Sequence, residues 1–253
     1  MTHYFHKGML LILMLLFLLP SITFASETLE AGRIIVHGAN SYAVNEDGVR
    51  RELKKDSQVY TGETIITNEN PLQIQFTDGG LTTLRPNTEF FIKSYLWEGG
   101  ANGKEEGFFE LIKGGLRTIT GAIGKKDRKK YQMMTPVAVI GIRGTDYSIR
   151  YCAEDCTEEE KEAAATDGLI GSVHSGRIEV SNEGGKRVFK RKNYFRVASR
   201  ALRPGRIKST ISRFLRIPGK FRYKPIRSLT RTLKRGAHAV ESGIKKLNPN
   251  RLF

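Results

Sequence analysis

The sequence predicts an all-β body followed by a basic tail, and two observations support that prediction. Short runs rich in β-branched and aromatic residues, such as LQIQF and DYSIRY, recur at a spacing of about ten residues. Between them, segments such as TDGG, RPN and NEGG supply the glycine, asparagine, aspartate and proline that turns require. Strands of this length and spacing are typical of a sandwich, a barrel or a solenoid.

The chain begins with a segment typical of exported proteins. Lys7 precedes an apolar run from Met9 to Leu19, and Pro20 and a small-residue site ending at Ala25 follow. A membrane span needs about 20 apolar residues, so this run is short for an anchor. We expect residues 1–25 to be a signal peptide that is cleaved after Ala25. An uncleaved N-terminal anchor is the alternative.

The body is expected to span residues 26–200. In chain order the predicted strands are GRIIVHG, LQIQF, LTTL, EFFIKSYLW, GFFELI, YQMM, PVAVIGI, DYSIRY, GRIEV and YFRVA. Thr157–Gly168 alone has a helical pattern, with a threonine cap and an acidic first turn, and we expect it to be a surface insertion between strands. Similar segments beginning at Gly32 and Gly176 favour repeated hairpins of one sheet system, with chance similarity as the alternative.

Cys152 and Cys156 are the two cysteines of the chain. In an oxidising compartment, two thiols at this spacing can close a small disulfide loop if the backbone turns between them. Two free thiols are the alternative. A metal site is disfavoured because two sulfurs supply half of a tetrahedral site and His37, His174 and His238 show no ligand spacing. The sequence therefore predicts neither a metal nor a cofactor.

Charge separates the body from the tail. From Lys186 onward the chain carries 22 lysines and arginines against one acid, Glu241, whereas the preceding 185 residues carry a net charge of −5. Residues 201–253 are expected to form a basic tail that is either an amphipathic helix or disordered. Nucleic-acid binding would suit this charge but not an exported chain.

Within the tail, apolar residues from Ile226 to Leu247 step by three and four, with basic residues opposite. Such a helix suits an anionic membrane surface, with anionic envelope polymers or the body itself as rival targets. A shorter apolar set, from Ile207 to Leu215, precedes Pro218. The predicted membrane-surface face comprises Leu229, Arg231, Leu233, Lys234, Arg235, Val240, Ile244 and Lys245.

Three segments between Glu63 and Ile149 carry a family resemblance: GETIITNENPLQIQFTDGGLTTLRPNTEFFI, FELIKGGLRTITG and TPVAVIGIRGTDYSI. Together they resemble the FecR domain, an all-β module of the Gram-negative cell envelope, and weaker similarity continues to Val197. The resemblance implies a β-solenoid or barrel-like body with a sensory or scaffolding role and no known chemistry. Its most specific block contributes the motif residues Thr135, Pro136, Ala138, Gly141, Arg143, Gly144 and Thr145.

This chain departs from the family's best-known members at its N-terminus. Those proteins are transmembrane regulators with a cytoplasmic anti-sigma region ahead of the membrane segment, whereas only eight residues precede the apolar run here. Eight residues are too few for a binding domain. We therefore expect a free-standing exported protein in the periplasm of a Gram-negative bacterium.

The glycines of the TPVAVIGIRGT block are not those of a phosphate-binding loop. Such a loop leads into a helix, whereas DYSIRY continues as a strand, so Gly141 and Gly144 are expected to relieve crowding or to form a bulge. If Arg143 is buried, it needs a carboxylate, for which Asp146 and Asp78 are candidates. GAIGKKDRKK is not followed by a predicted helix either, so it is not a phosphate-binding loop and is expected to be an exposed basic turn.

The sequence contains no recognisable catalytic constellation. The mature histidines are isolated, and neither Gly-x-Ser-x-Gly nor His-Glu-x-x-His occurs. We therefore expect a non-catalytic module that binds an envelope protein or glycan, with a cationic tail for an anionic surface. A transmembrane signalling regulator retained by an uncleaved anchor is the alternative, and an envelope enzyme acting on glycans is a lesser one.

Overall fold

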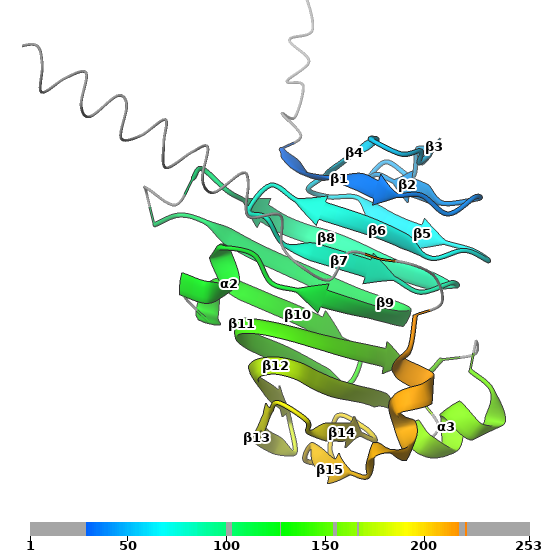
Figure 1. The fold of residues 1–253 in the computed structure, drawn as a ribbon, viewed down its shortest axis with the longest axis vertical. Helices are drawn as coiled ribbons and strands as arrows, with labels where there is room; N and C mark the ends of the chain where they lie inside the picture. The colour runs from blue at the N-terminus through cyan, green and yellow to red at the C-terminus, as the bar shows by residue number, and fades with distance from the viewer. Residues whose placement is uncertain are drawn as a thin grey trace, which may run out of the picture.

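The computed structural model describes residues 29–99, 103–126, 128–153, 156–165, 167–217 and 221. Fifteen strands pair into one continuous sheet (Figure 1), which confirms the all-β body that the sequence predicts. The predicted signal peptide and the predicted membrane-surface face, from Leu229 to Lys245, lie outside the described residues. Within the described ranges no helix is long and apolar enough to cross a membrane.

The first half of the body consists of short strands joined by tight turns. These are β1 (Glu30–Val36), β2 (Tyr42–Val44), β3 (Arg50–Glu52), β4 (Gln58–Tyr60), β5 (Thr64–Thr67), β6 (Leu72–Phe76), β7 (Leu81–Leu84) and β8 (Thr88–Leu96). The remaining elements are β9 (Glu106–Ile119), α2 (Ile123–Lys126), η1 (Arg128–Lys130), β10 (Tyr131–Thr135), β11 (Ala138–Tyr151), α3 (Glu158–Ala164), β12 (Leu169–Asn182), β13 (Gly185–Lys190), β14 (Tyr194–Val197), β15 (Gly205–Ile207) and η2 (Ser209–Leu215).

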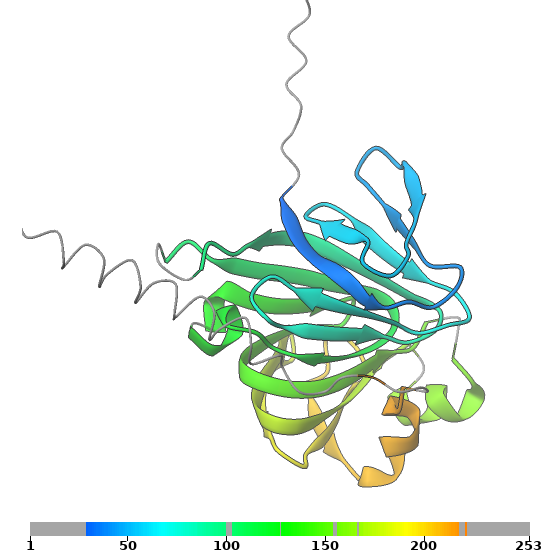
Figure 2. The same ribbon diagram turned by 45° about the horizontal axis from the view of Figure 1, so that its top comes forward.

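Three long strands fold this sheet into two layers. β9, β11 and β12 each span 14 residues. The two halves of each strand differ in at least one neighbour, while β11 and β12 stay paired with each other throughout. The first half of β9 pairs with β8 and β10, whereas its second half pairs with β7 and β11. Layer 1 therefore contains β2, β3, β5, β8, β10 and β13, and layer 2 contains β1, β4, β6, β7, β14 and β15. Figure 2 shows how the strands curve around the space between them.

A glycine in the left-handed region marks the bend of each long strand. These are Gly114 in β9, Gly144 in β11 and Gly176 in β12, with φ of 86°, 58° and 75°. Glycine adopts this conformation without the steric cost that other residues meet. The ladder between β11 and β12 shifts register at the same place, so Gly144 lies at a β-bulge as the sequence predicts. Gly141 differs, because a methyl group there would meet only the Glu179 carbonyl oxygen at 4.0 Å.

The hydrophobic core fills the space between the layers. Phe76, Tyr95, Phe90, Tyr131 and Phe109 are buried there, and the Phe109 ring centroid lies within 5.1–6.1 Å of the other four. Side chains at alternate positions of each strand point inward, as a sheet with one buried face requires. Ile140 and Ile142 are among them and are fully buried, so the TPVAVIGI run contributes directly to the core.

Three expectations about local structure need correction. PVAVIGI and DYSIRY are one bent strand, β11, rather than two. The basic segment after Gly121 is not only an exposed turn, because α2 forms within it and buries Ile123. The helix after Thr157 exists, with the predicted threonine cap, but Glu160 and Ala164 are buried, so α3 covers part of the body rather than projecting from its surface.

Candidate functional site

The outer faces of the two layers differ in what covers them. The outer face of layer 2 lies beneath α3, the two cysteines Cys152 and Cys156, and η2, and apolar residues of these elements form a second buried cluster. No element of the described chain packs in this way on the outer face of layer 1.

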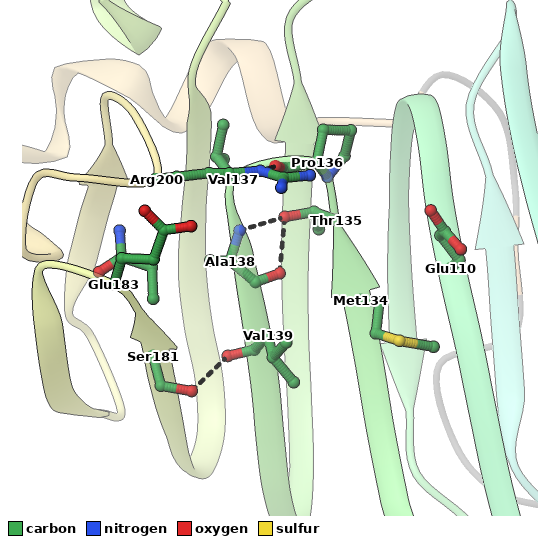
Figure 3. Close-up of a pocket in the computed structure, with 11 residues that line it drawn as sticks. Glu110, Met134, Thr135, Pro136, Val137, Ala138, Val139, Ser181, Glu183 and Arg200 are labelled. Atoms are coloured by element: carbon green, nitrogen blue, oxygen red, sulfur yellow. Dashed lines mark hydrogen bonds between the residues drawn. The ribbon is translucent and has the colours of Figure 1, made fainter.

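A groove on the outer face of layer 1 surrounds the β10–β11 hairpin (Figure 3). We call it the hairpin groove. It has a volume of about 310 Å³. Its lining residues are Glu110, Met134, Thr135, Pro136, Val137, Ala138, Val139, Ser181, Asn182, Glu183 and Arg200.

Three residues of the predicted motif, Thr135, Pro136 and Ala138, form the tip of this hairpin. The Thr135 hydroxyl accepts the amide N–H of Ala138 at 3.0 Å and donates to the Ala138 carbonyl at 2.9 Å, which fixes the tight turn. Nε of Arg200 donates to the carbonyl of Pro136, so the segment after β14 is held against the tip. Figure 3 shows Glu110 and Glu183 on opposite sides of the hairpin.

Side chains with apolar surface extend from the groove across the sheet. Cross-strand pairing places Phe91, Glu110, Met134, Val139, Ser181 and Lys186 in one outward-facing row. The neighbouring row contains Phe108, Gln132, Gly141, Glu179 and Val188. Phe91, Phe108, Met134 and Val139 are partly exposed, and Val188 is 38% exposed. We call this combined surface the layer 1 face.

The other motif residues lie away from the groove. Gly144 and Thr145 form the bend of β11, where the Thr145 hydroxyl donates to the Arg177 carbonyl at 2.7 Å. The side chain of Arg143 lies outside what the structure describes. Both carboxylates proposed as its partners have others: Asp146 pairs with Arg117, and Asp78 accepts the amides of Gly80 and Ile123. Burial raises the pKa of Asp78 despite these bonds.

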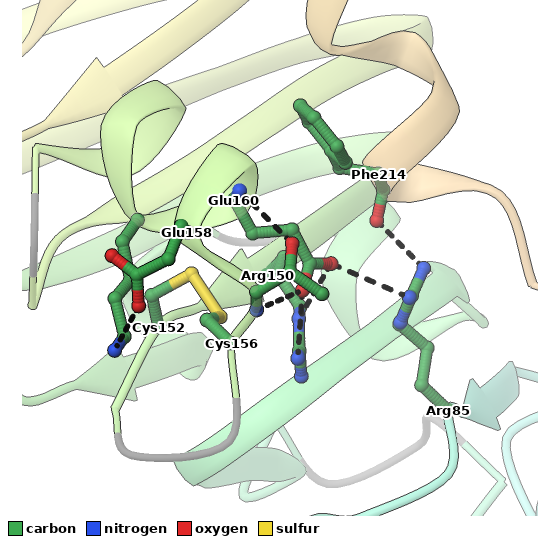
Figure 4. The surroundings of a disulfide bond; sticks show 9 residues. Arg85, Arg150, Cys152, Cys156, Glu158, Glu160 and Phe214 are labelled. Carbon is green, nitrogen blue, oxygen red and sulfur yellow. Dashed lines mark hydrogen bonds and ion pairs between the residues drawn. A yellow bond between two sulfur atoms is a disulfide. The ribbon is translucent and has the colours of Figure 1, made fainter.

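On the other side of the molecule, Cys152 and Cys156 are joined by a disulfide, with their α-carbons 5.4 Å apart (Figure 4). Cys152 directly follows β11 and Cys156 directly precedes the cap of α3, so the bond fixes the helix against the end of the strand. Both cysteines belong to the buried cluster that contains Ile170, Ile211 and Leu215. Among the described residues no group of three or more metal-ligating side chains occurs.

Glu160 links α3 to two arginines beneath it. Its Oε1 lies 3.4 Å from Nε of Arg150 and 3.7 Å from Nη2 of Arg85, and all three side chains are largely buried. Arg85 also donates from Nη1 to the carbonyls of Phe214, at 2.6 Å, and Arg216, at 2.7 Å. The helix, the sheet and η2 are therefore connected through one ionic network.

A polar row crosses layer 2 next to this network, and its role was not predicted from the sequence. Gln73, Thr83, Ser148 and Ser172 are each at most 3% exposed, and Arg117 lies in the same row. The signal was present as polar residues at alternate positions of LQIQF and DYSIRY, but a pattern of this kind ordinarily indicates a solvent-exposed face of a strand.

Ser148 and His174 form the one pair here that resembles catalytic machinery. The Ser148 hydroxyl and Nε2 of His174 are 2.8 Å apart. Partial burial lowers the pKa of His174, and the positive charge of Arg117 lowers it further, while the negative charge of Asp146 acts in the opposite direction. A hydrolytic triad also needs a carboxylate that orients the histidine, yet both oxygens of Asp146 accept from Arg117, at 2.9 and 2.8 Å. The described residues thus assemble a pair rather than a triad.

The described residues thus form an all-β body with a partly exposed apolar face on layer 1 and a covered polar face on layer 2. Residues 63–170 match the family model described as FecR protein, which confirms the resemblance noted from the sequence over that part of the chain. The match ends at Ile170, in the first half of β12.

Two crystal structures of a candidate anti-sigma factor from Parabacteroides distasonis ATCC 8503 are similar to this chain. They are 17% and 16% identical to it, with TM-scores of 0.44 and 0.43. The aligned regions cover 68% and 67% of this chain and 73% and 71% of the other. No curated protein matches the chain.

Proposed function

We propose that this protein is a non-catalytic sensory or scaffolding module of the cell envelope that binds a protein partner through the layer 1 face. The observation that carries the proposal is the partly exposed apolar surface of Phe91, Phe108, Met134, Val139 and Val188 around the hairpin groove. Contiguous apolar surface of this kind on a soluble domain is typical of interaction sites. The FecR match over residues 63–170 favours a regulatory or sensory role.

The composition of the layer 1 face favours a protein over a glycan. Met134, Val139 and Val188 contribute aliphatic and sulfur-containing surface beside Phe91 and Phe108, and such residues complement the apolar core of a protein interface. Polar groups lie among them, with Glu110 and Ser181 in the same row as Met134. A protein partner with an apolar centre and a polar rim therefore complements this surface.

The test compares two valine substitutions. Val139→Asp places a charge in the middle of the layer 1 face, whereas Val49→Asp makes the same change at a turn position that is 62% exposed. The full chain and both variants are used as bait in envelope extracts. We expect a partner that Val139→Asp loses and Val49→Asp retains, while both variants melt near the parent temperature.

A photo-crosslinking residue at Met134 or Val139 supplies a readout that does not depend on stability. Crosslinks to one protein from the layer 1 face, and none from Val49, support the proposal. Equal capture by all three chains would contradict it. Retention of a polysaccharide that Val139→Asp abolishes would assign the face to a glycan instead.

We further propose that the protein is periplasmic and that its tail contacts an anionic membrane surface. The predicted signal peptide and the net charge of +21 from Lys186 onward support this location and contact. The test is sedimentation with anionic and neutral vesicles, using the full chain and the double variant Leu233→Asp, Val240→Asp. Binding that ignores lipid charge, salt and the double change would overturn it.

A further inference from the structure

A second cavity lies between the outer face of layer 2 and the segment that contains η2, and it goes beyond the partner-binding role proposed above. We call it the layer 2 cavity. It has a volume of about 380 Å³, which is within the range of small-molecule sites. The sheet contributes Arg117, Ser148, Ser172, His174 and Tyr194, and the C-terminal segment contributes Ser212, Leu215, Arg216 and Ile217.

The lining is rich in hydrogen-bond donors and positive charge. Two of the nine residues are arginines, three are serines, one is a tyrosine, and none of these described lining residues is acidic. Arg117 is held in place by its two bonds to Asp146, which does not itself line the cavity. Guanidinium and hydroxyl groups in this arrangement favour an anionic group such as carboxylate or phosphate.

Two hydroxyl groups on the sheet side are buried at the cavity wall, whereas His174 beside them is exposed. Ser148 and Ser172 are 1% and 3% exposed and lie opposite each other in adjacent strands. Ser148 is fixed by its 2.8 Å hydrogen bond to His174. Burying a polar side chain at a cavity wall costs free energy of desolvation, and hydrogen bonds from a polar ligand can offset that cost.

We propose that the layer 2 cavity binds a small solute that carries a carboxylate or phosphate group together with hydroxyl groups. Because four of the lining residues belong to the segment from Ser212 to Ile217, such a ligand would contact the sheet and that segment together. Ligand binding therefore stabilises the docking of η2 on layer 2. This segment belongs to the first part of the predicted basic tail, residues 201–253, so ligand binding strengthens the attachment of that part to the body.

A pair of arginine substitutions tests the site. Arg216→Gln removes a charge from the cavity but keeps the Arg216 backbone carbonyl that Arg85 binds. Arg213→Gln is the matched control, because the Arg213 guanidinium bonds Glu159 and does not line the cavity. Calorimetric titration of the full chain with inorganic phosphate, glucose 6-phosphate and glucuronate should show binding by at least one anion. Neutral glucose should bind at least tenfold more weakly.

We expect Arg216→Gln to weaken anion binding about tenfold, the effect of one charge-assisted hydrogen bond, and Arg213→Gln to leave it within about twofold. Ser172→Val, which fills the cavity wall, should also weaken binding, whereas Ser181→Val in the hairpin groove should not. Bound anion should slow amide exchange at Ile211 and Leu215. Glycerol 1-phosphate compared with phosphatidylglycerol vesicles distinguishes a free solute from a lipid headgroup.

Two results would overturn the inference. One is a titration in which none of the anions gives a heat of binding at millimolar concentration. The other is an equal affinity for the anion in the Arg216→Gln and Arg213→Gln variants. Both are independent of the partner experiment, because Val139→Asp lies on the opposite layer. Loss of partner binding with intact anion binding, or the reverse, would separate the two proposals.

Discussion

Gly144 and Gly176 meet where β11 and β12 bend together, and a methyl group added to Gly176 would lie 2.5 Å from the carbonyl oxygen of Gly144. That distance is too short for a carbon and an oxygen that are not bonded. The two strands therefore pass from layer 1 to layer 2 as a pair because neither has a side chain at the corner. Gly144, the second glycine of the GIRGT block, therefore allows the two strands to bend at this corner.

The two corner glycines should differ in their tolerance of alanine. At Gly144 an added methyl group meets only the Lys125 side chain at 3.4 Å, so the left-handed backbone alone should cost about 1 kcal/mol of unfolding free energy. At Gly176 steric overlap adds to this, and we expect about 3 kcal/mol or more. Urea unfolding of both variants gives the comparison, and equal losses would contradict it.

Substitution of Ile140 by aspartate should destabilise the body severely. Ile140 is fully buried between the layers, so the variant buries a charge without a partner, at a cost of about 4 kcal/mol or more. Val139→Asp, one residue earlier but facing outward, is the control and should shift the melting temperature much less. If the two variants melt alike, β11 does not face the core as described.

Removal of the Glu160 charge should lower the free energy of unfolding far more than removal of the Glu159 charge. Glu160→Gln leaves Arg85 and Arg150 without their shared carboxylate, and breaking a buried ion pair costs about 3–5 kcal/mol. Glu159 pairs with Arg213 at an exposed position, so Glu159→Gln should change stability by less than about 1 kcal/mol. Thermal unfolding of both variants measures the difference, and similar stabilities would show that Glu160 is solvated.

The disulfide should be detectable and moderately stabilising. The disulfide closes a short loop. Closing a loop of this size lowers the conformational entropy of the unfolded chain, which stabilises the folded state by about 2 kcal/mol. The double variant Cys152→Ala, Cys156→Ala should lose about this much, and a reducing agent should lower the stability of the parent chain but not of the variant. A parent chain insensitive to reduction, with free thiols by mass spectrometry, would contradict the bond.

The mature protein should begin at or near Ser26. The short apolar run and the small-residue site at Ala25 predict cleavage there. N-terminal sequencing of the protein from the periplasmic fraction checks this directly. Intact Met1 on protein extracted from the membrane would favour the anchored alternative.

Sequence patterns were sufficient for the class of fold because inward and outward residues alternate in most strands. LQIQF, YQMM and the predicted helix cap at Thr157 all correspond to the observed elements. The first half of β12 was missed because LIGSVHS combines glycine, serine and histidine, which are poor indicators of a strand taken alone. β2 and β3 are only three residues long, too short for alternation to be visible.

The candidate sites were less predictable, for a physical reason. Thr135, Pro136 and Ala138 could be selected from the motif, but the contributions of Ser181 and Arg200 to the same groove depend on how β12 and the segment after β14 pack beside the hairpin. Ser148 appears as an ordinary outward-facing strand residue until η2 covers it, and Ser172 lies in the half of β12 that the sequence did not reveal as a strand. Burial by a distant segment is a tertiary property that local patterns do not contain.

The contacts of Arg85 with the carbonyls of Phe214 and Arg216 join parts of the chain 129 and 131 residues apart. Closing so long a loop is entropically costly, so these bonds should form late in folding, after the local hairpins. For a chain synthesised from its N-terminus, Arg85 emerges long before its acceptors do. The polar side of layer 2 is therefore completed only when nearly the entire body has been made, which gives a newly synthesised molecule an interval in which that side is open to small solutes.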